Sequence, residues 1–368
     1  MSRPIRNITV VLGLAATLLM TGCWERPPME SKQLGYRGTG MVDITNPRID
    51  GPVLAAQTIP EVVPAAGGDV PILAGDIYEN VQVLGDLNVA EFARIMVAIT
   101  AWVSPEQSCL YCHVEGESMA ADTLYTKVVA RRMIEMTRDV NTDWTAHVAE
   151  TGVTCYTCHR GKPVPDMIWF ADPGPKTARG LAGNRAGQNA AAPAVGLASL
   201  PFDPFTPFLL QDRRIGVGSA AALPDGSNTA DIMQTEWTYG LMIHMSNSLG
   251  LNCTGCHNSR HFGSWEESTP QRVSAWHGIR MARSLNTEYI EPMTPIFPEN
   301  RLGPMGDVGK VYCATCHQGV QKPLNGVSML ADYPELRAPA AEPLAEPEAE
   351  PEAGQETEAV TETIAAVR

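Results

Sequence analysis

Apolar residues recur at helical spacing in several stretches of the chain. The first stretch begins with a capping box made by Asn88 and Glu91, and Ser104-Pro105 ends it. One helical face between these ends is apolar, at Phe92, Met96, Ile99 and Val103. The same spacing groups Val129, Met133, Met136 and Val140 on one face, and Met242, Met245 and Leu249 on another. The pattern predicts a series of amphipathic helices.

The first residues resemble an export signal. Arg3 and Arg6 precede a short apolar run, and Met20-Thr21-Gly22-Cys23 follows it. A small residue directly before a cysteine is typical of a bacterial lipoprotein signal, which predicts that residues 1–22 are removed and that Cys23 is lipidated. The alternative is an ordinary signal peptide with an incidental cysteine. No later stretch reaches the 18 or so uninterrupted apolar residues of a membrane helix.

Charge is distributed unevenly along the chain. The net charge is −14, which argues against nucleic acid as a partner. Residues 338–368 hold eight glutamates and one arginine, half of that net charge, in a Pro-Ala-Glu repeat. Such a composition buries too little apolar surface to fold, so we expect a disordered acidic tail.

Cysteine spacing gives the strongest indication of chemistry. Eight of the nine cysteines fall into four C-x-x-C-H motifs, the signature of c-type haem attachment. The motifs are Cys109–Cys112–His113, Cys155–Cys158–His159, Cys253–Cys256–His257 and Cys313–Cys316–His317. Two thiols at this spacing bond the vinyl groups of one porphyrin, and the histidine that follows binds its iron. The sequence therefore predicts four covalently bound haem c groups.

Zinc sites and disulfides are the alternative uses of these cysteines. Tetrahedral zinc needs more ligands than one histidine for each cysteine pair supplies. A bridge within a C-x-x-C pair would be strained and labile, although disulfides suit an exported protein. Haem attachment accounts for all four motifs.

Methionines ahead of three haem motifs are candidates for the second axial ligand. Met96, Met133 and Met242 each lie on a predicted helix that precedes a motif. Methionine stripes are common in apolar cores, so a packing role is the alternative for any one of them. Their recurrence before three motifs favours ligation.

An internal repeat bears on the fourth haem. Asn141-Thr142-Asp143-Trp144 matches Asn286-Thr287-Glu288-Tyr289 at an offset of 145, which aligns Met136 with Met281 and Met133 with Gly278. If Met133 is a ligand, the fourth haem has no equivalent methionine and must take its ligand from elsewhere. His147, in a short helix expected to begin at Asn141 or Thr142 and end near Gly152, is the best donor. In the competing scheme Met136 and Met281 are the ligands, and His147 is not used.

Longer runs of sequence resemble the tetrahaem cytochrome subunit of purple bacterial photosynthetic reaction centres. The similarity extends from about Cys23 to Leu336. The most specific runs are 83–85, 102–105, 129–133, 151–161, 269–272 and 333–336. Residues 169–229 and the acidic tail depart from the family pattern.

The resemblance implies a complete set of axial ligands. It pairs His113 with Met96, His159 with Met133, His257 with Met242, and His317 with His147. It also places Arg272 beside the third haem, which makes this arginine a candidate for tuning the potential of that haem.

The resemblance further implies a mainly α multihaem cytochrome with little β structure and two pseudo-symmetric halves. Each half would carry two helix-loop haem-binding units. We expect an extended segment at 23–75, a first dihaem half at 76–165, a Pro/Gly/Ala-rich connection at 166–230 and a second dihaem half at 231–337.

The function implied is electron transfer, without catalysis. A soluble periplasmic cytochrome or iron-sulfur protein would reduce the haems, which would then reduce the photo-oxidised bacteriochlorophyll special pair. Partners would be reaction-centre core subunits of the L, M and H type, at the periplasmic face of the photosynthetic inner membrane. Acidic charge would steer a cationic donor, or would only keep an exported protein soluble. The rival class is a multihaem oxidoreductase, which needs an iron with an open coordination position.

Overall fold

The computed structural model describes residues 29–35, 40–65, 67, 71–172, 174, 191–218 and 231–338. The expected signal peptide, Cys23 and nearly all of the acidic tail therefore lie outside the described residues, as does much of the predicted connection at 166–230. The described residues up to Ala338 belong to one compact unit.

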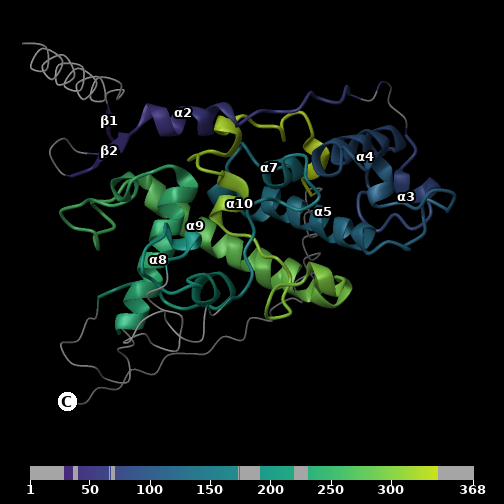
Figure 1. Ribbon diagram of the computed structural model, residues 1–368. Helices are drawn as coiled ribbons and strands as arrows, with labels where there is room; N and C mark the ends of the chain where they lie inside the picture. The colour runs from purple at the N-terminus through teal and green to yellow at the C-terminus, as the bar shows by residue number, and fades with distance from the viewer. Residues whose placement is uncertain are drawn as a thin grey trace, which may run out of the picture. The chain divides into compact units, whose positions relative to one another are not determined.

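Helices dominate the described structure (Figure 1). Its helices of four or more residues in regular α geometry are α2 (Pro47–Ala55), α3 (Ala74–Ile77), α4 (Val89–Val103), α5 (Tyr125–Asp143), α6 (Thr145–Val148), α7 (Cys155–His159), α8 (Ile232–Leu249), α9 (Pro270–Ser284) and α10 (Cys313–His317). The 3₁₀-helical turns are η1 (Ser108–Tyr111), η2 (Pro193–Val195), η4 (Cys253–Gly255), η6 (Glu291–Ile296), η7 (Glu299–Arg301), η8 (Pro323–Gly326) and η9 (Pro334–Leu336), and the π-helical turns are η3 (Thr206–Leu210) and η5 (Leu285–Ile290). Strands β1 (Glu30–Gln33) and β2 (Val42–Thr45) pair antiparallel, with Glu30 opposite Thr45.

The expectation of a mainly helical protein with little β structure is confirmed. Helix α4 follows the sequence pattern closely, because Asn88 and Glu91 form the capping box and the helix ends at Val103. The methionine-bearing stretches predicted at 129–140 and 242–249 lie within α5 and α8. Within the described ranges, no helix is both long enough and apolar enough to cross a membrane.

The helix that contains His147 begins later than expected. Asn141 and Thr142 belong to the last turn of α5, and α6 starts at Thr145. The reason is tertiary: Oδ1 of Asn141, a residue 5% exposed, accepts from the N–H of Val153 at 2.7 Å, and its Nδ2 donates to the carbonyl oxygens of Val153 and Leu336 at 2.9 Å each. A side chain engaged in this way is not available to cap a new helix.

Three apolar clusters connect the helices. The first joins Ile95 and Trp102 of α4 with Ile134 of α5 and with the C-terminal segment around Tyr333. The second joins α8 and α9 with Trp169 and η3, and the third joins Val140 of α5 with Met281 and Leu285. Trp102 and Tyr333 meet edge to face, with ring centroids 4.6 Å apart. These clusters hold the helices that bear the candidate ligands.

A buried arginine fastens the C-terminal segment to α4. Arg94 pairs with Glu335 at 3.0 Å, and the two side chains are 7% and 9% exposed. The guanidinium also donates to the carbonyl oxygens of Val63, Pro64 and Asp332, and lies 4.2 Å from the centroid of the Tyr333 ring. Through these charge-assisted hydrogen bonds, Arg94 links α4 to residues 63–64 and to residues 332–335.

We predict that Arg94→Ala destabilises the haem-loaded protein by about 3–5 kcal/mol, because it leaves the Glu335 carboxylate buried without its partner. Urea unfolding followed by circular dichroism would measure the free energy. The matched control is Lys162→Ala, which removes the exposed Lys162–Asp166 pair and should cost no more than about 1 kcal/mol. Equal losses in the two variants would contradict this account.

Candidate haem-binding sites

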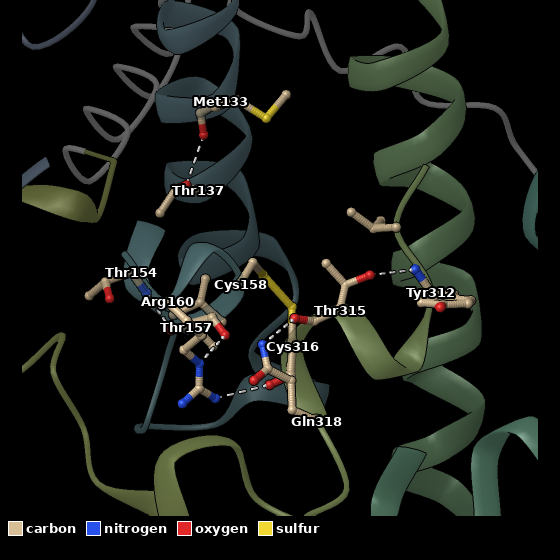
Figure 2. The surroundings of a disulfide bond; sticks show 12 residues. Met133, Thr137, Thr154, Thr157, Cys158, Arg160, Tyr312, Thr315, Cys316 and Gln318 are labelled. Carbon is tan, nitrogen blue, oxygen red and sulfur yellow. Dashed lines mark hydrogen bonds between the residues drawn. A yellow bond between two sulfur atoms is a disulfide. The ribbon is translucent and has the colours of Figure 1, made fainter. Parts of the chain in front are cut away.

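The second and fourth C-x-x-C-H motifs form the short helices α7 and α10 (Figure 2). The backbone N–H of Thr154 donates to the Thr157 hydroxyl at 3.0 Å, and that of Tyr312 donates to the Thr315 hydroxyl at 3.0 Å. Both helices end directly after the motif histidine, because Arg160 and Gln318 adopt left-handed conformations with φ of 51° and 48°.

A buried asparagine holds the backbone ahead of each of these two motifs. Asn141 donates to the carbonyl oxygen of Val153 at 2.9 Å and accepts from its N–H at 2.7 Å. Asn286 makes the same two bonds with Val311, at 2.9 Å each. In the sequence the two asparagines stood out as the first residues of the repeat, and Asn141 also as a possible helix start, but their role in holding this backbone was not predicted.

Glycines tie the ends of these motifs to the longer helices. The Gly161 N–H donates to the carbonyl oxygen of Trp102 at the end of α4, and the Gly319 N–H donates to that of Ser248 near the end of α8, both at 2.8 Å. Each motif is thus fixed at its start by an asparagine and at its end by a second helix.

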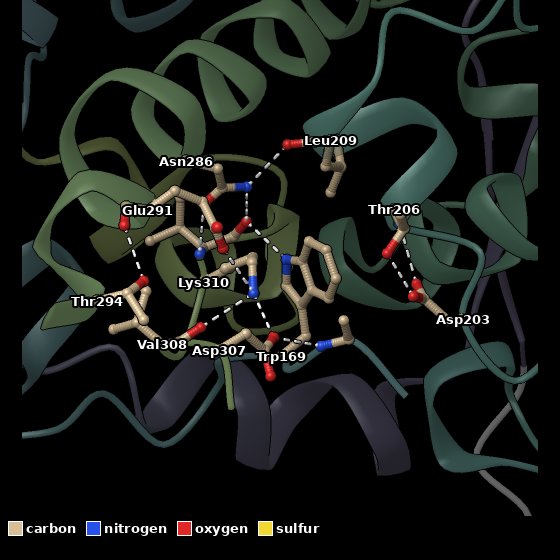
Figure 3. Close-up of polar contacts among 12 residues, drawn as sticks. Trp169, Asp203, Thr206, Leu209, Asn286, Glu291, Thr294, Asp307, Val308 and Lys310 are labelled. Carbon is tan, nitrogen blue, oxygen red and sulfur yellow. Dashed lines mark hydrogen bonds and ion pairs between the residues drawn. The ribbon is translucent and has the colours of Figure 1, made fainter. Parts of the chain in front are cut away.

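The segment before the fourth motif has an additional anchor (Figure 3). The fully buried ammonium of Lys310 pairs with Asp307 and, at 2.9 Å, with Glu291. Its backbone exchanges two hydrogen bonds with Trp169, whose indole N–H donates to the carbonyl oxygen of Val311 at 3.0 Å. Nothing in the sequence singled out Lys310, since its Trp169 partner is distant along the chain.

Four of the five histidines proposed as ligands donate Nδ1–H to a backbone carbonyl oxygen. The pairs are His147 with Ser274 at 2.9 Å, His159 with Lys162 at 2.8 Å, His257 with Phe262 at 3.0 Å and His317 with Val320 at 3.1 Å. Because a carbonyl oxygen only accepts, the proton of a neutral ring lies on Nδ1 and the Nε2 lone pair is left for a metal. His113 differs, since its Nδ1 is buried without a hydrogen-bond partner.

Burial keeps these imidazoles neutral. It lowers the pKa values of His113, His147, His159 and His257. Burial, followed by the proximity of His147, lowers the pKa of His317 to about 4. The neutral ring is the form that binds a metal, so the electrostatics fit haem ligation.

The rings of His147 and His317 lie close to each other. Their ring centroids are 6.0 Å apart and their planes are inclined by 67°. A metal–imidazole bond is about 2 Å long, so two rings on opposite sides of one metal ion have centroids about 6 Å apart. The spacing therefore fits one iron held between these two residues.

Most of the candidate methionines lie in or beside the apolar clusters. Met96, Met136 and Met242 are half-buried beside the first, third and second clusters, and Met133 is half-buried on α5. Met281 is buried in the third cluster. Burial is therefore similar for methionines of both schemes, and the ligand set and its pairing with individual histidines stay predictions.

Arg272 lies near Cys256 and His257 of the third motif. It lies over the Trp265 ring, 4.0 Å from the centroid, and donates to the Ser268 hydroxyl at 2.7 Å. Burial, and in smaller part the positive charge of Arg272, lower the pKa of His257. The arginine is therefore close enough to act electrostatically on a haem bound at this motif. Its effect on a haem potential stays a prediction.

Two of the predicted haem cysteines are joined in the structure. Cys158 and Cys316 form a disulfide, with Cα atoms 4.5 Å apart (Figure 2). A sulfur bonded to another sulfur cannot also bond a haem vinyl carbon, so the bridge and the predicted attachment exclude each other. The sequence had pointed only to bridges within a motif. The approach of these two motifs depends on tertiary structure. The other six motif cysteines are free.

Helical segments that present C-x-x-C-H motifs, with Nε2 of the histidines left for iron, define a c-type cytochrome. Over residues 25–337 the chain matches the family described as "Photosynthetic reaction centre cytochrome C subunit". The chain therefore belongs to the photosynthetic reaction-centre cytochrome c subunits, which are electron carriers that bind haem c covalently and are not enzymes.

Proteins with the name photosynthetic reaction center cytochrome c subunit are similar to it over most of their length. The protein from Rubrivivax gelatinosus is 53% identical over 93% of this chain and 92% of its own. The protein from Thermochromatium tepidum is 51% identical over 90% of this chain and 81% of its own. The protein from Roseobacter denitrificans is 45% identical over 83% of this chain and 85% of its own.

We predict that Cys158 and Cys316 are thioether-bonded in the haem-loaded protein. Peptides that contain either residue should carry haem in mass spectra, and reduction followed by alkylation should label neither. Cys155 and Cys313, which are free in the structure, serve as the internal comparison and should behave identically. Labelling of Cys158 and Cys316 only after reduction would show that the disulfide persists.

Proposed function

We propose that this protein holds four haem c groups and passes electrons from a soluble periplasmic donor to the photo-oxidised special pair of the reaction-centre core. The closeness of the His147 and His317 rings, with centroids 6.0 Å apart, is the main support, because together they would hold an iron on both sides and leave no position for a substrate. When bound, haem supplies an iron that alternates between the ferrous and ferric states.

The axial ligands in this proposal are those inferred from the sequence. His113 and Met96 bind the first iron, His159 and Met133 the second, His257 and Met242 the third, and His317 and His147 the fourth. The Nδ1 hydrogen bonds of four of these histidines support it, because they fix the tautomer and the orientation of each ring. Methionine ligation raises a haem potential, so ligand type alone makes the fourth haem the lowest.

The proposed arrangement has two pseudo-symmetric halves, at 76–165 and 231–337. Matching hydrogen bonds support it: the Asn141–Val153 pair corresponds to Asn286–Val311, and the bond from Gly161 to α4 corresponds to that from Gly319 to α8. Cys158 and Cys316 occupy equivalent positions in the two motifs. Their Cα separation of 4.5 Å makes the second and fourth attachment sites neighbours where the halves meet.

Membrane attachment and docking complete the proposal. Lipidation of Cys23 would anchor the protein at the periplasmic face of the photosynthetic membrane, beside L-, M- and H-type core subunits. A single acyl chain binds a membrane reversibly, so contact with the core would add to the anchor. The net charge of −14 favours a cationic cytochrome as donor over an anionic one.

The test is flash spectroscopy on washed membranes with and without this protein. With it, the special pair should recover while ferrous c-type haem is oxidised, and the haems should stay oxidised until a soluble donor is added. In a deletion strain the special pair should recover more slowly, with no haem signal. Recovery at the same rate in both membranes, without haem oxidation, would contradict the proposal.

A further inference from the structure

We propose that Gly278 selects the ligand of the fourth iron. The missing side chain at this point of α9 leaves the space that the His147 ring occupies, so the ligand comes from α6 and not from α9. This inference rests on the proposed pairing of His147 with His317.

Gly278 is packed directly against the imidazole. A Cβ atom built on Gly278 would lie 2.5 Å from Cε1, 2.9 Å from Nδ1 and 3.0 Å from Nε2 of His147. The first of these distances is well inside van der Waals contact. Any side chain at residue 278 therefore competes with the ring for the same space.

The ring has little freedom to move aside. Its Nδ1 donates to the carbonyl oxygen of Ser274, one turn before Gly278 on the same helix, at 2.9 Å. The His317 ring also lies close to it, at a centroid distance of 6.0 Å. A side chain at residue 278 would have to break the Ser274 bond or change the approach to His317.

The backbone does not call for glycine here. Gly278 lies inside α9, in a regular helical conformation that any residue adopts. Glycine destabilises a helix interior relative to alanine, so the helix alone would favour another residue. The space taken by His147 is the reason that the structure offers.

The position has a counterpart in the other half of the chain. Asn141 and Asn286 make identical amide pairs, which aligns α5 with α9 at an offset of 145. That offset aligns Met136 with Met281, and these two methionines share one apolar cluster. It also aligns Gly278 with Met133, the proposed ligand of the second iron. Where α5 has Met133, α9 therefore has Gly278, which leaves room for a histidine from α6.

The experiment compares variants of the haem-loaded protein, each first checked for full haem content. Gly278→Ala and His147→Ala should each make about one haem in four reactive toward carbon monoxide, because each disturbs or removes one axial ligand. The matched control is Gly51→Ala, a glycine inside α2 with no atoms within 4 Å of its added Cβ, which should change nothing.

The combined variant Gly278→Met/His147→Ala tests ligand choice directly and keeps the test valid if Gly278→Ala folds poorly. It should lose carbon monoxide reactivity, gain intensity in the near-infrared band of ferric haem with methionine ligation, and show a higher potential for one haem. A carbon monoxide-reactive haem in this double variant would overturn the inference, as would a Gly278→Ala protein indistinguishable from Gly51→Ala. An unchanged His147→Ala protein would overturn the proposed ligand pair as well, which separates the two failures.

Discussion

A hydrogen bond from histidine Nδ1 to a backbone carbonyl oxygen is the interaction on which the proposed haem sites depend. It fixes the neutral tautomer and leaves Nε2 for iron, and it occurs at His147, His159, His257 and His317. The carbonyl groups that accept from His159 and His317 belong to residues three positions further along the chain, just past a left-handed residue that ends the helix. The local backbone therefore orients each of these rings, and the longer helices have only to bring a second ligand to it.

In the proposed haem sites the second ligand comes from a different segment, which is why the buried contacts around the motifs matter. Asn141 and Asn286 hold the backbone ahead of the second and fourth motifs, and Lys310 adds a buried charged anchor at the fourth. An electron carrier needs its iron to keep the same ligands in both oxidation states. Rigid attachment at both ends of a motif serves that need better than a flexible loop.

Local signals in the sequence predicted the parts of the molecule that local interactions determine. The Asn88–Glu91 capping box located α4, and the C-x-x-C-H spacing located every haem motif. The predicted start of α6 was wrong because the Asn141 side chain is hydrogen-bonded to Val153 and Leu336 and does not cap a new helix. The approach of Cys158 to Cys316 and the fit of His147 against Gly278 could not be predicted as contacts, because each joins segments far apart in the chain.

In the proposed haem sites, protein side chains close both axial positions of every iron. Carbon monoxide added to the reduced native protein tests it most directly, since the gas binds ferrous haem only where a position is open or its ligand is easily displaced. With both positions closed on every iron, the visible spectrum should not change. A shift of the Soret band by a substantial fraction of the haem would contradict it and would reopen the case for catalysis.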